Sequence, residues 1–319
     1  MFTGLKNDNL IFNYKATEDK RAIVDKLYLL ASPLVKYSKI TTGVKPYQIG
    51  KGIPLQTKHI VEHKPYTTFQ VIAKDITWKK LIRGTQVNRY ALKWEGEYIK
   101  YGKWLAEPRN ENIFSNSKLF VRRTDDTIMT VFDDSGMVGI NSIHTIHATS
   151  ILEEKVIMCL LNSRLLNWVF QFQNFHMVGK PLAEIKVVFL ERLPIIVPTN
   201  KEFFIEMAEL MLSKNKLLSE KLKQFIQLIF SKFPSLTLSA KLEKWYILSF
   251  SDFAKELNKQ KIKLSLQEES EWLQYFDQEK QKAIALKTEI DIADKEIDKM
   301  VYNLYGITEE EIKIIEDNI

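Results

Sequence analysis

The stretch KLFVRRTDDTIMTVFDDSGMVGINSIHTIHA, residues 118–148, decides the fold of the first half of this 319-residue chain. Three of its runs are rich in β-branched and aromatic residues, and the turn sequences TDD and DDSG separate them. These runs predict strands at Lys118–Arg123, Thr127–Phe132 and Met137–Ala148. Because the connections between them are short, we expect a small antiparallel meander.

Two amphipathic helices are predicted beside this meander. The first, Ala16–Ser32, begins near Thr17, a residue type that caps helices, and the second is Glu153–Phe172. Their apolar stripes are Ile23, Leu27 and Leu30 in the first helix, and Val156, Leu160, Leu161, Leu165 and Trp168 in the second. The run IKVVFLERLPI that follows predicts a buried strand ending at Pro194.

Beyond residue 198 the pattern is almost wholly helical. A broad apolar face spans 207–225, and the sequence FPS at Phe233–Ser235 interrupts it. Over about 268–305 apolar residues alternate at three- and four-residue steps, with only Glu279 out of type. The heptad residues are Trp272, Phe276, Ala283, Leu286, Ile290, Ala293, Ile297, Met300 and Leu304. Such a seam requires a partner helix, so we expect a hairpin with the helix around Leu210, a contact with another protein, or a homodimer.

The fold class expected from these patterns is α+β. A mixed α/β domain with short antiparallel strands is predicted at 1–198, and a helical, coiled-coil-like domain at 199–319. The two parts also differ in charge. Residues 1–198 contain 20 Lys and 8 Arg against 18 Asp and Glu, a net of +10, whereas 199–319 contain 18 Lys, no Arg and 22 acids, a net of −4. A basic, arginine-bearing part favours nucleic acid as a partner, although ordinary surface charge explains the same numbers.

Composition limits the class of protein. The hydrophobic share of 45% and charged share of 27% are typical of a globular chain, and the longest apolar runs, such as Val156–Leu161, are far shorter than a bilayer span. The first residues, MFTGLKNDNL, lack the apolar core of a secretory signal, and the single Cys159 allows no internal disulfide. We therefore expect a cytoplasmic protein without membrane partners.

Catalytic motifs are sparse in the sequence. It contains no Pro-Pro dipeptide, and therefore no Asn/Asp-Pro-Pro-aromatic turn of an amino-methyltransferase, and no glycine-rich cofactor loop. The best carboxylate set for a metal-dependent nuclease is Asp133 or Asp134 with Glu184 and Lys186. The histidine pairs at 59/63 and 144/147 lack further zinc ligands nearby. We predict neither a catalytic nor a metal site on this chain.

Six segments, in this order, resemble the TaqI-like C-terminal specificity domain of adenine-N6 DNA methyltransferases and type IIG restriction-modification enzymes. They are KITTGVKPYQIGKGIPLQT (39–57), WKKLIRGTQVNRYALKW (78–94), YGKWLAEPRNENIF (101–114), INSIHTI (140–146), LLNSRLLNW (160–168) and GKPLAEIKVVFLERLP (179–194). The helical tail is similar to the segment that closes many of the fused enzymes.

The resemblance implies that the chain reads a short double-stranded DNA sequence and presents its adenine to a methyltransferase. In the family, the catalytic part precedes the specificity domain, so this chain is expected to bind DNA without catalysis, either as a fragment or as a separate specificity subunit. S-adenosylmethionine, and Mg²⁺ where a nuclease is present, are expected on that catalytic domain or subunit. The implied location is the bacterial cytoplasm.

Polar side chains within the resembling segments are the candidates for DNA contact. They are Lys51, Gln56, Arg83, Arg89, Lys103, Arg109, Arg122, Arg123, Asn141, Ser142, His144 and Lys180. Adjacent strand residues point to opposite faces, so only one of Arg122 and Arg123 is expected to face DNA. Arg109 has an alternative role, which is to pair with a carboxylate inside the domain.

Two rival functions remain open from the residues alone. One is a nuclease built around Asp134, Glu184 and Lys186. The other is a protein-interaction scaffold in which the heptad helix is the working surface and the basic charge is incidental.

Overall fold

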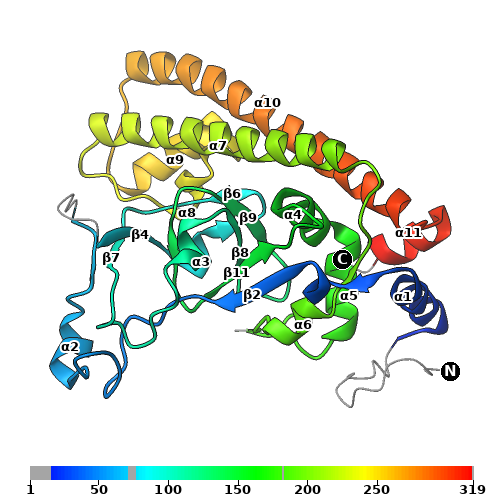
Figure 1. Cartoon of the computed structure of the whole chain (residues 1–319). Coiled ribbons are helices and arrows are strands. Elements are labelled where there is room, and N and C mark those ends of the chain that lie inside the picture. The colour runs from blue at the N-terminus through cyan, green and yellow to red at the C-terminus, as the bar shows by residue number, and fades with distance from the viewer. Residues whose placement is uncertain (1–15, 71–76, 182, 318–319) are drawn as a thin grey trace. The chain divides into compact units, whose positions relative to one another are not determined.

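The computed structural model describes residues 16–70, 77–181 and 183–317. These residues form two compact units. The described residues within Met1–Glu209 and Glu296–Ile319 form the first, here called the mixed unit, and Leu210–Lys295 form the second, the helical unit. Figure 1 labels most of their elements. The predicted α+β class is confirmed, because short, mostly antiparallel strands lie in the mixed unit and long helices follow.

One four-stranded sheet of the mixed unit is built around β8 (Lys118–Arg122). Strand β8 pairs with β9 (Thr130–Asp133) and β11 (Ile143–Ala148), and β11 also pairs with β2 (Ser38–Thr42), all antiparallel. The strands expected within residues 118–148 therefore exist, but their spatial order, β2-β11-β8-β9, is not a meander. The second half of the expected third strand, β11, pairs with β8 and not with β9, and its first half joins another sheet.

The other four-stranded sheet has the order β10-β4-β7-β3. Strand β10 (Val138–Gly139) pairs in parallel with β4 (Trp78–Ile82), while β7 (Tyr98–Lys100) pairs antiparallel with both β4 and β3 (Thr67–Thr68). Two short antiparallel pairs complete the strands: β1 (Ser32–Pro33) with β12 (Pro194–Ile195), and β5 (Val87–Asn88) with β6 (Ala91–Leu92).

The mixed unit also contains helices before, between and after these strands. Thr17 stands at the N-cap of α1 as predicted, and Ile23 and Leu27 are buried, but Leu30 at the end of the expected stripe is exposed. The described helices before residue 200 are α1 (Glu18–Leu30), α2 (Lys58–His63), α3 (Asn112–Ser115), α4 (Glu154–Asn162), α5 (Arg164–Gln173) and α6 (Val187–Glu191), with 3₁₀ turns at Leu34–Lys36 and Gly84–Gln86.

Two sequence expectations in this region were wrong. The single helix expected over Glu153–Phe172 is two helices, because the hydroxyl of Ser163 accepts a hydrogen bond from the backbone N–H of Leu166 and caps α5. The segment expected as a buried strand before Pro194 is instead the helix α6, and its Val188 is exposed. The expectation failed because the apolar run is too short for periodicity to separate helix from strand.

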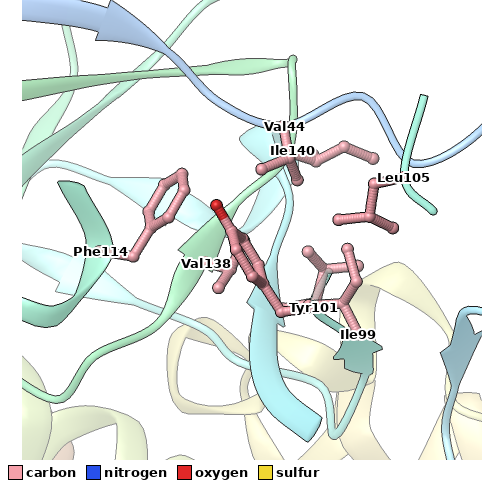
Figure 2. Close-up of a cluster of buried hydrophobic side chains, with 8 residues drawn as sticks. Val44, Ile99, Tyr101, Leu105, Phe114, Val138 and Ile140 are labelled. Atoms are coloured by element: carbon pink, nitrogen blue, oxygen red, sulfur yellow. The ribbon is translucent and has the colours of Figure 1, made fainter. Parts of the chain in front are cut away.

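The sheet β10-β4-β7-β3, here called the second sheet, contributes to a compact apolar core, shown in Figure 2. The rings of Tyr101 and Phe114 meet edge to face, with centroids 6.1 Å apart. The cluster consists of Val44, Leu81, Ile99, Tyr101, Leu105, Phe114, Val138 and Ile140. It therefore joins the second sheet to the chain that follows β2 and to the segment after β7.

The helical unit is a hairpin formed by parts of the two longest described helices, α7 (Lys201–Lys232) and α10 (Leu266–Leu304). The parts that belong to this unit lie within Leu210–Lys295. Ion pairs join Lys214 to Glu289 and Lys221 to Glu279, so the two helices are antiparallel. Between them lie α8 (Ala240–Glu243), a 3₁₀ turn (Trp245–Ile247) and α9 (Phe250–Lys259). This confirms the predicted hairpin and the end of α7 before the FPS sequence.

The heptad seam is filled by this same chain. Phe276, Ala283 and Ile290 are buried, and Phe225 of α7 stacks on Trp245 at 3.8 Å in an aromatic cluster that includes Phe276. The out-of-type Glu279 is also buried, and it pairs with Lys221 of α7 and with Lys282. The seam is thus occupied without a second copy of the chain.

The last residues of α10 and the short α11 (Glu309–Glu316) belong to the mixed unit. The hydroxyl of Tyr305 donates to the carbonyl oxygen of Pro194 (2.7 Å), and Arg164 pairs with Asp298 (3.2 Å). Thr308 and Glu311 form a capping box at the start of α11. No helix in the described part of the chain is long and apolar enough to span a bilayer.

Candidate nucleic-acid interface

The loop between β2 and α2 is organised by one buried amide. Gln56 is 2% exposed; its Oε1 accepts from the backbone N–H of Gln48, and its Nε2 donates to the carbonyl oxygens of Pro46 and Trp104, each at 2.8 Å. Both Nε2 hydrogens are therefore used inside the chain. The sequence suggested Gln56 as a candidate for DNA contact, but in the structure its side chain closes the loop through hydrogen bonds.

Two candidate lysines lie together on this loop and the segment beside it. The backbone N–H of Ile53 donates to the carbonyl oxygen of Lys103 (2.8 Å), which joins the loop of Lys51 to the segment after β7. Both lysine side chains are exposed, and neither ammonium group pairs with a carboxylate among the described residues. These two cations remain available to a phosphate.

The aromatic stretch YGKWLAEPRNENIF is mainly a packing segment. Tyr101, Leu105 and Phe114 belong to the buried cluster of Figure 2. The hydroxyl of Tyr101 donates to the carbonyl oxygen of Arg109, and burial raises the pKa of this phenol to about 12. The indole N–H of Trp104 donates to the carbonyl oxygen of Lys100 (2.9 Å). Lys103 makes no ion pair with a described residue.

Arg109 is held inside the domain, as the alternative role predicted. Its Nε donates to the carbonyl oxygens of Thr42 (3.0 Å) and Gly43 (3.3 Å), and its Nη2 pairs with Glu107 (3.1 Å). Arg109 therefore clamps the end of β2, and much of its donor capacity is already used.

Arg83 makes a bidentate ion pair with Glu97. Its Nε and Nη2 each lie 2.6 Å from a different carboxylate oxygen, and Glu97 is buried. These hydrogen bonds raise the pKa of the Arg83 guanidinium. The guanidinium donors that could bind a guanine edge are thus occupied by Glu97, a buried carboxylate that needs this counter-charge.

Arg122 and Arg123, at the end of β8, both bind acids or carbonyl oxygens. Arg122 donates to the carbonyl oxygen of Thr124 (3.0 Å) and lies 3.4 Å from Asp125. Arg123 donates through Nε and Nη2 to one carboxylate oxygen of Glu184 (3.0 and 2.6 Å), and through Nη1 to the carbonyl oxygen of Asn141 (2.8 Å). Neither side chain of the pair lies free on the surface.

The INSIHTI segment ties the two four-stranded sheets together. The hydroxyl of Ser142 accepts from the backbone N–H of Gly84 (3.0 Å), and its carbonyl oxygen accepts from the backbone N–H of Arg123 (3.0 Å). His144 is buried, with Nδ1 3.1 Å from the Thr42 hydroxyl and Nε2 2.8 Å from the carbonyl oxygen of Ile185. Desolvation lowers the pKa of His144, so the neutral imidazole is favoured.

The remaining two candidates lie elsewhere. Arg89 donates from Nη2 to the carbonyl oxygen of Asn162 (2.7 Å), and so fastens the β5–β6 turn to the end of α4. Lys180 is exposed in the segment after α5, and its ammonium group makes no ion pair with any described residue.

Two carboxylates of the nuclease hypothesis form ion pairs with basic side chains. Asp133 is buried and pairs with buried Lys118 (2.7 Å), and Glu184 pairs with Arg123. Asp134 and Lys186 are exposed. Over residues 16–70, 77–181 and 183–317, no group of three His, Cys, Asp or Glu side chains could hold a metal ion.

The sequence analysis missed the aliphatic side chains beside Lys51. Ile49, Ile53 and Leu55 are 60%, 64% and 68% exposed. The signal was present in the sequence, because these residues flank two turn-forming glycines in a stretch that contains lysines and no acid.

Comparison with known families gives two matches along the chain. Residues 79–195 match the TaqI-like C-terminal specificity domain, and residues 198–301 match a domain of unknown function (DUF8810). Neither match reaches half of the chain. The resemblance noted from the sequence is thus confirmed for 79–195, whereas the segment KITTGVKPYQIGKGIPLQT lies before the match. No curated protein matches the chain.

Similar solved structures include two restriction-modification proteins. One is the type IIL enzyme MmeI in complex with DNA, at a TM-score of 0.42 and 12% identity, covering 87% of this chain and 34% of that chain. The other is a type I S subunit from M. genitalium, at a TM-score of 0.33 and 13% identity, covering 72% and 47%. This chain spans about a third of the first protein and just under half of the second.

Proposed function

We propose that this chain recognises a specific sequence in double-stranded DNA as the specificity part of a restriction-modification system. The observation that carries the proposal is the match of residues 79–195 to the TaqI-like C-terminal specificity domain. The net charge of +10 over residues 1–198 supports it, because duplex DNA attracts a basic surface.

Lysines rather than arginines make the first contacts in this proposal. Lys51, Lys103 and Lys180 are exposed and unpaired, whereas the forks of Arg83, Arg109 and Arg123 are occupied by carboxylates. A lysine acts as a point charge on a phosphate and carries little base information. These lysines therefore fix the position of the domain on the duplex, and other side chains choose the bases.

The catalytic partner is proposed to be an adenine-N6 methyltransferase domain or subunit, of the type IIG kind. S-adenosylmethionine, and Mg²⁺ where a nuclease is present, would bind to that partner. This chain alone binds DNA and does not modify it. Its place of action is the bacterial cytoplasm, where the DNA is.

The test is fluorescence anisotropy of the chain with a random-sequence duplex pool, titrated from about 50 to 200 mM salt. Three phosphate contacts predict a slope of about −2.7 in log affinity against log salt, which is a loss of roughly 40-fold across that range. Selection of the bound pool should then enrich one short sequence. The absence of salt-dependent binding, or binding with no enrichment, would contradict sequence recognition by this chain.

A further inference from the structure

The tip of the β2–α2 loop presents an apolar cluster to solvent. Ile49, Ile53 and Leu55 are each at least 60% exposed, and exposed Pro54 lies between the last two. Single exposed aliphatic residues are ordinary on protein surfaces, but three within seven positions form a patch. Such a patch in one short loop is a candidate binding surface.

The loop is held rigidly by hydrogen bonds. The backbone N–H of Gly50 donates to the carbonyl oxygen of Gln56 (2.9 Å), and the N–H of Gln56 donates to that of Lys51 (2.8 Å). Gly52 has a φ of +85°, and a Cβ at this position would lie 2.4 Å from the carbonyl oxygen of Trp104. The backbone of the tip is thus held against the segment after β7, and it carries the exposed aliphatic side chains.

The two segments that form the tip and its support are rich in lysine. The two segments that meet here, 45–61 and 98–106, contain five lysines and neither Asp nor Glu. The lysines are Lys45, Lys51, Lys58, Lys100 and Lys103. Of these, Lys51 and Lys103 lie beside the aliphatic residues, because the Ile53 N–H donates to the Lys103 carbonyl oxygen. The acids that directly follow the two segments, Glu62 and Glu107, pair with Lys58 and Arg109. The unpaired charge of Lys51 and Lys103 beside the tip attracts a polyanion.

We propose that the loop Ile49–Leu55 is a DNA-contacting wedge. Lys51 and Lys103 bind phosphates, and Ile53 and Leu55 enter a groove and press on a base step, which they partly unstack. Aliphatic side chains and proline act in this way in proteins that deform DNA, where they sit between phosphate-binding residues. The proposal rests on the proposed function, and it adds a position at which the duplex is deformed.

The prediction that separates a wedge from plain electrostatic binding concerns stacking. Unstacking one base step costs a few kcal/mol in an intact duplex and much less where the stack is already interrupted. The wild-type chain should therefore bind a short duplex with a one-nucleotide gap about tenfold more tightly than the intact duplex.

The experiment measures both affinities by fluorescence anisotropy, with the wild-type chain, Ile53→Ser/Leu55→Ser, Leu55→Ser alone and Leu29→Ser. The control residue Leu29 is also strongly exposed, but it lies on α1. We expect the double variant to lose the preference for gapped DNA, to bind intact duplex about tenfold more weakly, and to keep the salt slope of the wild type. The single variant should lie between, and Leu29→Ser should match the wild type.

The outcomes distinguish this proposal from the proposed function. If the wild type binds no duplex at low salt, recognition of DNA by this chain fails and the wedge fails with it. If the wild type binds with a steep salt slope, but the double variant binds each duplex with the same affinity as the wild type, DNA recognition stands and the wedge is overturned. In that case the apolar tip serves another partner. Unchanged thermal unfolding of the variants establishes that the comparison is between folded proteins.

Discussion

Two regions of the mixed unit contain basic residues and use them in opposite ways. At the ends of β8 and β4, Arg123 and Arg83 are bound to Glu184 and Glu97. On the loop beside Trp104, Lys51 and Lys103 bind no carboxylate of the described chain. The segments 45–61 and 98–106 contain no acid, and the acids that follow them, Glu62 and Glu107, are paired with Lys58 and Arg109. A basic residue is thus available to a nucleic acid where the fold provides no carboxylate for it.

The largest loss of stability is expected from replacing Lys118, a lysine that is buried and paired. It is 0% exposed, and its ammonium group lies 2.7 Å from both Asp133 and the carbonyl oxygen of Phe114. Lys118→Met leaves Asp133 buried without its partner, so the free energy of unfolding should fall by about 3–5 kcal/mol in urea denaturation. A loss below about 1 kcal/mol would mean that the hydrogen bonds from Ser135 and Met137 suffice to hold the charge of Asp133.

The rigidity of the lysine-bearing loop can be tested at its two glycines. Gly50 and Gly52 both have positive φ, but only Gly52 faces a close atom. Gly52→Ala should therefore reduce stability by about 1–3 kcal/mol and weaken DNA binding, whereas Gly50→Ala should cost about 1 kcal/mol. Thermal unfolding of both variants gives the comparison. Equal losses would indicate that the contact with Trp104 is relieved by movement of the loop.

The structural role of the arginines predicts a stability effect without loss of a phosphate contact. Arg83→Gln leaves buried Glu97 unpaired, and should cost about 1–3 kcal/mol of unfolding free energy. Arg123→Gln releases Glu184, which is 46% exposed, and should cost less than about 1 kcal/mol. The salt slope of DNA binding should stay unchanged in both. A slope lower by about one would instead identify a phosphate contact.

The buried imidazole of His144 predicts a moderate pH dependence. Because desolvation lowers its pKa in the folded state, the unfolded chain binds a proton first as the pH falls below about 6.5. The stability is fully present above that pH and decreases on acidification toward the folded pKa. His144→Gln should show a flatter change in urea midpoint between about pH 7.5 and 5.5. An identical pH dependence would show that other groups cause it.

The smallest effect on stability is expected at the free lysines. Lys51→Ala and Lys103→Ala remove exposed side chains, so the unfolding free energy should stay within about 0.5 kcal/mol of the wild type. Each should reduce the magnitude of the salt slope by about one. Lys39→Ala, at an exposed lysine of β2 with no predicted DNA role, is the matched control. Unchanged slopes in Lys51→Ala and Lys103→Ala would remove this loop from the interface.

The elements that sequence predicted well are those whose pattern is long and local. The heptad over α10 and the β-branched run of β8 identified a helix and a strand. By contrast, α6 was expected as a strand because its run of four apolar residues cannot distinguish the two periods. The strand order failed for a different reason: the pairing of β10 with β4 joins residues more than 50 positions apart, which no local pattern records.

The candidate interface was predictable to a smaller degree. Sequence identified Lys51, Lys103 and Lys180, whose exposure agrees with a role on the surface. It also selected Gln56 and His144, which are buried. Sequence could not reveal this, because their partners, Trp104 and Ile185, are distant along the chain. The pairing of Arg123 with Glu184 also joins residues that are distant along the chain. Residue type indicates what a side chain can bind, but tertiary structure decides whether that partner is already inside the protein.

The membership of residues 296–317 in the mixed unit makes the helical unit an insertion. Its chain leaves the mixed unit after Glu209 and returns at Glu296, so both of its ends are anchored in the same body. A truncation near residue 198 would remove Tyr305 and Asp298, which bind Pro194 and Arg164. An engineered minimal specificity module should therefore replace the inserted hairpin with a short linker and retain the C-terminal segment.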